Sequence, residues 1–178
     1  MKILSCGAGM QSTALALMSC ENKKEIKYKE VPIYDAVIFC DLGSEPIWVY
    51  KQVDFIKNAC EDAEIPFYIL DTHLHQDYLN NFGKRRVVSI PFWSVDENGK
   101  KGKMMRNCTL DYKINEIIKF VKYKLLGYAK YQRVKNKDLK AHEMHLGFSL
   151  EEKHRCKENK HKMFVNKFPL VDMELTRA

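Results

Sequence analysis

The sequence lacks any long hydrophobic run. No stretch approaches the roughly 18 consecutive apolar residues that a membrane helix needs, and the opening Met-Lys-Ile-Leu-Ser is not a charged region followed by a long apolar segment. We therefore expect a soluble protein that is neither exported nor bound to a membrane.

Paired cysteines are also absent. The six cysteines are scattered singly along the chain: Cys6, Cys20, Cys40, Cys60, Cys108 and Cys156. The lack of any Cys-x-x-Cys pair argues against a ribbon-type zinc site and against a compact disulfide framework. A reducing cytoplasm is the compartment that fits this pattern best.

Repeats, low-complexity tracts and linkers are missing as well. The 178 residues, 46% of them hydrophobic and 30% charged, are enough to bury the core of one globular domain. We expect a single domain over residues 1–178.

The charge balance is basic, with 30 Lys and Arg against 23 Asp and Glu and a net charge of +7. The excess is concentrated in Lys119 to Lys140 and Lys153 to Lys167. Such a field attracts phosphate, on a nucleotide or on a nucleic acid. The alternative is an ordinary solvated basic surface.

The first seventy residues alternate between strand and helix patterns. Strands are predicted at residues 2–5, 36–40 and 67–70, and helices at 12–22 and 47–60, with Pro46 in the first turn of the second helix. The expected buried stripes of the two helices are Ala14, Leu15, Leu17 and Met18, and Trp48, Val49, Val53 and Ile56. This order predicts an α/β fold with an open, mainly parallel sheet and helices on both faces.

The rest of the chain is less regular. Residues 71–105 stay open between loop and hairpin, with an edge strand or lid at 85–93 and a turn at 96–100. A helix over 111–126 ending near Gly127, a strand at 143–148 and a helix start at 149–152 follow.

The loop after the first strand has the composition of a phosphate-binding loop. Gly7 and Gly9 let the backbone approach an anion, and the following helix directs its unpaired amides toward the ligand. It is not a Walker loop, because no Gly-Lys-Ser/Thr follows. Loops 5–13 and 41–46 should face one crevice, since both follow parallel strands. The alternative to phosphate binding is that Gly7 and Gly9 only form a tight turn.

Residues 7–12, Gly-Ala-Gly-Met-Gln-Ser, resemble the Ser-Gly-Gly-x-Asp-Ser loop of the ATP-pyrophosphatase (PP-loop) superfamily. Gln11 in place of the aspartate is similar to the form in phosphoadenylylsulfate (PAPS) reductases. Residues 41–50 are similar to the family's Asp-Thr-Gly-x-x-x-Pro-Glu-Thr-Tyr segment, residues 106–114 to its Cys-x-x-x-x-Lys-x-x-Pro signature, and residues 147–155 to its Gly-x-Arg-x-x-Glu-x-x-x-Arg region. The chain most resembles PAPS-reductase-like proteins of phages and mobile elements, which share the Gly-Ala-Gly-x-Gln-Ser opening and the Thr-Arg-Ala ending. This resemblance implies a protein that acts in a host cytoplasm.

The resemblance implies an adenine nucleotide alpha-hydrolase-like fold and a site for ATP or PAPS, with Mg²⁺ assisting a pyrophosphate leaving group. The implied nucleotide-binding residues are Ser5, Gly7, Gly9, Gln11, Ser12, Thr13, Asp41, Gly43, Arg106, Lys113, Gly147 and Arg155.

Several of these residues have a second interpretation. Asp41 either positions the ribose or adenine side or caps a turn. Arg106 and Lys113 either contact a polyphosphate or are surface cations. Cys108 is a weak candidate for a nucleophile, since single cysteines are more often buried and inert. His73 and His75, with Asp71 and Asp77, form either a metal site or, as we favour, a polar loop.

The chain departs from the family pattern at two places. It shows no Glu-Cys-Gly-x-His/Leu tail, so it is expected to be a form without that tail. Asn107 stands where cluster-bearing relatives have a cysteine, so no iron-sulfur cluster is expected.

Three functions therefore stay open. The first is a PP-loop enzyme that cleaves ATP between its α and β phosphates and activates an acceptor as an adenylate. The second is a PAPS-binding protein or a reductase-like enzyme of sulfur metabolism, for which Gln11 is the right residue. The third is a non-catalytic module that binds nucleotide and nucleic acid. Neither the acceptor nor the oligomeric state follows from the sequence.

Overall fold

The structure, a computed structural model, describes residues 1–72, 74–81, 93–103 and 110–177. The chain is divided into two compact units. The first unit contains Met1–Phe39, Pro46–Ile69 and Ala129–Ala178, and the second unit contains Cys40–Glu45 and Leu70–Tyr128.

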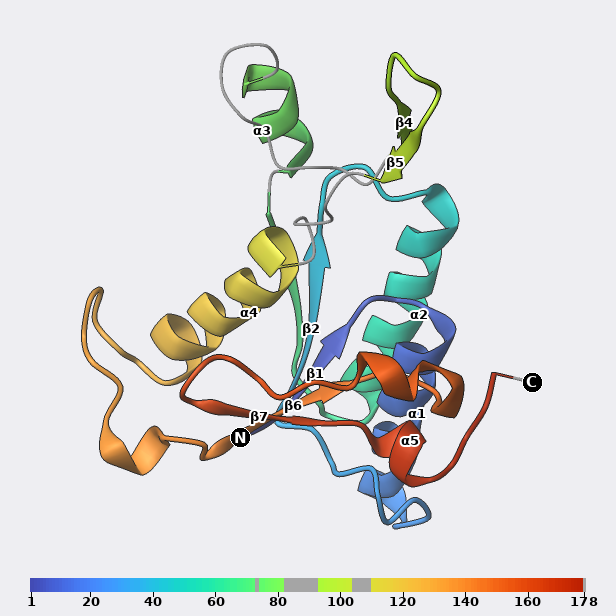
Figure 1. The fold of residues 1–178 in the computed structure, drawn as a ribbon. Helices are drawn as coiled ribbons and strands as arrows, with labels where there is room; N and C mark the ends of the chain where they lie inside the picture. The colour runs from blue at the N-terminus through green and yellow to red at the C-terminus, as the bar shows by residue number, and fades with distance from the viewer. Residues whose placement is uncertain (73, 82–92, 104–109, 178) are drawn as a thin grey trace. The chain divides into compact units, whose positions relative to one another are not determined.

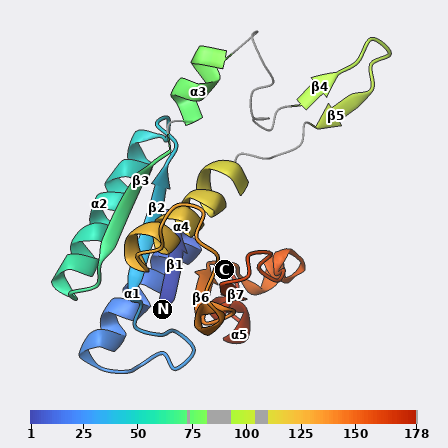
Figure 2. The same cartoon turned by 90° about the vertical axis from the view of Figure 1, so that its left-hand side faces the viewer.

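Five strands form one sheet in the order β3-β2-β1-β6-β7, which can be followed across Figure 2. They are β1 (Lys2–Cys6), β2 (Ala36–Asp41), β3 (Phe67–Asp71), β6 (His142–Leu146) and β7 (Phe164–Lys167). β1 pairs in parallel with β2 and with β6, and β6 pairs in parallel with β7. The expected parallel sheet is confirmed. β7 was missed because its Phe-Val-Asn-Lys sequence lies within a basic stretch.

Helices α1 (Met10–Lys24) and α2 (Ile47–Asp62) lie side by side in the first unit (Figure 1). A core cluster joins them to the sheet through Leu4 and Phe39 of the strands, Leu15 of α1, and Val53 and Ile56 of α2. β2 is buried from residue 36 to 40, as its continuous apolar run predicts.

The buried faces of both helices differ from the prediction. The buried residues of α1 include Ser12, Leu15, Ala16, Ser19 and Cys20, whereas Ala14, Leu17 and Met18 are only half-buried. Hydrophobicity alone misses this face because its serines are satisfied internally; Ser19 Oγ accepts the Tyr34 amide at 3.0 Å. In α2 the exposed fraction of Trp48 is 70%, and Pro46 is the N-cap rather than part of the first turn.

The second unit contains α3 (Leu74–Asn81), the antiparallel strands β4 (Trp93–Val95) and β5 (Lys101–Lys103), and α4 (Asn115–Phe120) between π-helical turns at Leu110–Ile114 and Val121–Leu125. The turn at 96–100 is confirmed: the Asp96 carboxylate accepts the Asn98 and Lys100 amides. The helix expected at 111–126 is also confirmed. α3 was missed, and residues 85–92 of the expected edge strand or lid lie outside the described residues.

Short 3-10 helices at Asn136–Asp138 and Leu150–Arg155, and α5 (Pro169–Asp172), complete the first unit. The helix start predicted after the strand at 143–148 is thus confirmed as a 3-10 turn. Among the residues that the structure describes, no helix is long and apolar enough to cross a membrane.

Candidate functional site

The strand order reverses at β1, where a ligand crevice is expected in an open parallel sheet. β1 leads through α1 to β2 on one side, while β6, its neighbour on the other side, leads to β7. The loops that follow β1 and β6 therefore meet at the carboxyl ends of adjacent strands, where Ser5 pairs with Leu146. Both loops belong to the first unit.

The loop after β1 is stabilised by its own polar groups. Ala8 has the left-handed φ of +53°. Gly9 is the N-cap of α1 and has no side chain that could accept a hydrogen bond from the amides of the first helical turn. The Gly7 amide donates to Ser12 Oγ at 3.2 Å, and the hydroxyls of Ser12 and Thr13 donate to the Gly9 carbonyl at 3.1 and 2.9 Å. Both hydroxyls thus fix the loop, and the uncapped helix start is the part suited to an anion.

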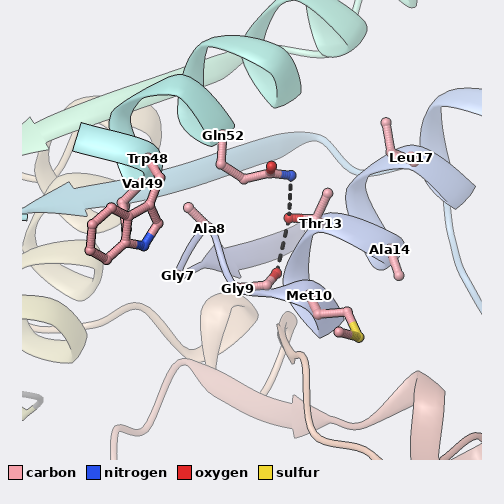
Figure 3. Close-up of a pocket in the computed structure, with 10 residues that line it drawn as sticks. All are labelled: Gly7, Ala8, Gly9, Met10, Thr13, Ala14, Leu17, Trp48, Val49 and Gln52. Carbon is pink, nitrogen blue, oxygen red and sulfur yellow. Dashed lines mark hydrogen bonds between the residues drawn. The ribbon is translucent and has the colours of Figure 1, made fainter. Parts of the chain in front are cut away.

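A cleft of about 730 Å³ opens between this loop and the amino-terminal halves of α1 and α2 (Figure 3). It is lined by Gly7, Ala8, Gly9, Met10, Thr13, Ala14, Leu17, Trp48, Val49 and Gln52. Gln52 Nε2 donates to Thr13 Oγ1 at 3.2 Å and so connects the two helices. The volume lies within the range of small-molecule sites, and the exposed Trp48 indole gives the cleft an aromatic wall.

Gly147, which follows β6, touches the loop directly. A Cβ at this position would lie 2.7 Å from the Ser12 amide nitrogen and 3.0 Å from the Gln11 carbonyl carbon. Only glycine leaves room for the two backbones to approach this closely. The structure therefore brings the predicted residue Gly147 together with Gln11 and Ser12.

A carboxylate connects the first turn of α1 to two arginines. Gln11 Nε2 donates to Glu152 Oε2 at 2.8 Å, and Arg177 donates to the same oxygen at 2.9 Å. Arg155 pairs with the other oxygen and packs over the Phe148 ring, 4.5 Å from its centroid. Partial burial would raise the pKa of Glu152, but the hydrogen bonds from Arg155 and Arg177 outweigh it and lower that pKa. The Glu152 carboxylate, which contacts Gln11, is thus already paired with two positively charged guanidinium groups. These neighbours do not suit a protein-held Mg²⁺ ion, which is bound by carboxylate and other oxygen ligands.

Three further predicted residues, Asp41, Gly43 and Lys113, belong to the second unit. Asp41 Oδ1 accepts the Gly43 amide at 2.8 Å, the turn-capping role weighed above. Lys113 Nζ lies 3.5 Å from Glu45 Oε1, so its charge is paired within that unit. Arg106 and Cys108 lie outside the described residues.

The Asp and His residues of the second unit contact other groups. His75 Nδ1 is 2.8 Å from Ser44 Oγ, and Asp77 accepts the Tyr112 hydroxyl at 2.9 Å. Within residues 1–72, 74–81, 93–103 and 110–177, no group of three His, Cys, Asp or Glu side chains could hold a metal ion. His73 lies outside these ranges.

Trp48 and Gln52, which line the cleft from α2, were not among the predicted site residues. Trp48 was expected in the apolar stripe of its helix; its place two residues after Pro46, in the first turn of a helix that follows a strand, is the signal that could have marked it. No protein-family model matches the chain, and no curated protein matches it.

Proposed function

We propose that the protein binds an adenine nucleotide at the loop of residues 5–13 and acts as a PP-loop-type enzyme on ATP or on a sulfonucleotide. The observation that carries the proposal is the cleft of about 730 Å³, one wall of which is the glycine loop at the uncapped start of α1. The phosphates bind the amides of Gly9 and the first turn of α1, and the base lies against Trp48.

The chemistry that this arrangement supports is positioning and charge stabilisation. On ATP, an acceptor oxygen or sulfur attacks the α phosphorus, the bond from that phosphorus to the bridging oxygen breaks, and pyrophosphate leaves while the acceptor keeps the adenylate. The amides at the start of α1 stabilise the charge that develops on the phosphates. On a sulfonucleotide, Gln11 offers a neutral amide where the ATP-cleaving relatives that the loop resembles have an aspartate.

A thermal-shift panel tests the proposal with ATP, AMP, PAPS and adenosine 3′,5′-bisphosphate. A ligand at 100 times its dissociation constant stabilises a fold by about 2.7 kcal/mol. The matched variant is Gly9→Ala: its Cβ meets nothing within 4 Å in the folded protein, yet it narrows the approach to the loop. We expect wild type to respond and Gly9→Ala to respond less. If wild type responds to none of the four, the proposal is wrong.

Product assays then separate the two reactions. Pyrophosphate release from ATP identifies the ATP enzyme, and thioredoxin-dependent sulfite release from PAPS identifies the reductase. Tight binding of PAPS with neither product identifies a binding protein.

A basic segment of the first unit favours nucleic acid as a second ligand. Residues 129–140 contain Lys130, Arg133, Lys135 and Lys137, and Tyr131 among them is 85% exposed with Lys130 Nζ 5.3 Å from its ring centroid. Cations beside an exposed aromatic ring suit single-stranded nucleic acid. Oligonucleotide binding that weakens steeply with added salt supports this function, and absent or salt-insensitive binding excludes it.

A further inference from the structure

Three donors from separate parts of the first unit converge on Glu152. Its Oε2 atom accepts from both Gln11 Nε2 and Arg177, at 2.8 and 2.9 Å, and its Oε1 atom pairs with Arg155. Two donors that share one acceptor atom are necessarily close neighbours. The guanidinium of Arg177 therefore lies beside Gln11, in the first turn of the helix that follows the glycine loop.

The backbone around Arg177 is held independently of this ion pair. The Arg177 amide donates to Glu151 Oε1 at 3.0 Å, and the Leu175 carbonyl accepts the Leu150 amide at 2.8 Å. The Leu175 amide in turn donates to the Leu170 carbonyl at 2.8 Å. These bonds place residue 177 next to the 3-10 helix at Leu150–Arg155, whichever group its side chain contacts.

We propose that Arg177 is a phosphate-binding residue of this site and that Glu152 is the positioning residue that holds it beside the loop. The proposal rests on the nucleotide function proposed above. A guanidinium carries five N–H donors, so one carboxylate oxygen cannot satisfy it. The side chain of Arg177 is 55% exposed and keeps donors available to an anion. Its planar donors match two phosphate oxygens at once, which a lysine cannot do.

The test compares ATP with adenosine, which has the same base and sugar but no phosphate. Dissociation constants are measured by calorimetry, with adenosine measured in competition with ATP. We expect Arg177→Gln to weaken ATP about tenfold and to leave adenosine unchanged, and Arg177→Lys to recover part of the loss. Lys29→Gln is the matched control, because it removes the same charge from an exposed position of the first unit and should leave both affinities unchanged.

Each other result has a definite meaning. Equal ATP affinity of Arg177→Gln and wild type overturns the proposal and leaves the nucleotide site intact. Equal losses for ATP and adenosine show a structural role for Arg177 and also overturn it. If wild type binds none of ATP, adenosine and PAPS, the nucleotide function itself is wrong.

Discussion

The side-chain amide of Gln11 donates a hydrogen bond to Oε2 of Glu152 over 2.8 Å, although 141 positions separate the two residues. An ionised carboxylate only accepts hydrogen bonds, so the nitrogen of the amide must face Glu152. The side-chain carbonyl oxygen of Gln11 then points away from Glu152. The 3-10 helix after β6 thus fixes which atom the first turn of α1 presents beside its glycine loop.

Replacing Gln11 by Glu sets a second carboxylate against Glu152. We expect the free energy of unfolding to fall by about 1–3 kcal/mol, because a charged acceptor loses its donor. Urea denaturation measures the change. The double variant Gln11→Glu with Glu152→Gln restores one donor and one acceptor, so it should be more stable than the two single changes predict together. Additivity within about 0.5 kcal/mol would show that the two side chains do not interact.

Gly147→Ala tests the contact between the loops after β1 and β6. The new methyl group would lie 2.7 Å from the Ser12 backbone nitrogen, so one of the two loops must move. Overpacking of this kind costs about 1–3 kcal/mol, which thermal denaturation detects. Gly9→Ala serves as the control, since its methyl group meets nothing within 4 Å. Equal stability of the two variants would contradict the close approach.

The regular part of the fold follows from local patterns. The run at residues 36–40 is apolar throughout because β2 is buried along this length. A strand of this kind can be predicted without any tertiary information. β7 could not be predicted, because only Phe164 of its four residues is fully buried and the stretch around it is rich in lysine. The buried face of α1 was misplaced because its serines are satisfied by backbone amides, Ser12 by that of Gly7 and Ser19 by that of Tyr34.

Local patterns predicted the candidate site only where one loop carries it, and Gly147 and Arg155 were implied by the family resemblance alone. The glycine loop was recognisable from Gly7 and Gly9 within a short segment. The bond between Gln11 and Glu152 depends on β1 and β6 being neighbours in the sheet, which no local pattern encodes. The exposure of Trp48 likewise depends on which face of α2 packs against the sheet.

Trp48 provides a direct probe of the cleft. The chain has two tryptophans, so Trp93→Phe leaves Trp48 as the sole source of tryptophan emission. We expect ATP to quench this emission, and Trp48→Ala to lose about 1–3 kcal/mol of binding free energy, the usual worth of a base stacked on an aromatic ring. Phe55→Ala removes another exposed aromatic side chain of α2 that does not line the cleft and should bind normally. Unquenched emission at saturating ATP would place the base elsewhere.

Two buried histidines of β6, His142 and His145, make stability depend on pH. His145 is 3% exposed, with Nε2 3.0 Å from Glu143 Oε2, and burial lowers its pKa below 6.5 despite this carboxylate. Lys2 and Lys167 lower it further. Burial, together with the positive amino terminus, also lowers the pKa of His142. Both rings are therefore neutral in the folded protein under conditions where the unfolded chain already binds protons.

The sign of the pH dependence follows from these lowered values. Well above pH 6.5 the rings are neutral in both states, and their contribution to stability is fully present. As the pH drops from 7 toward 5, the unfolded state takes up more protons than the folded state, so the free energy of unfolding falls. Each histidine contributes a slope of at most about 1.4 kcal/mol per pH unit. His145→Gln, which does not titrate, should flatten the curve measured by urea denaturation, whereas His154→Gln, at an exposed position, should leave it unchanged. The titration of Glu143 does not interfere, because its lowered pKa lies below 4.5, outside this window. An unchanged slope in His145→Gln would mean that the ring is protonated in the folded protein.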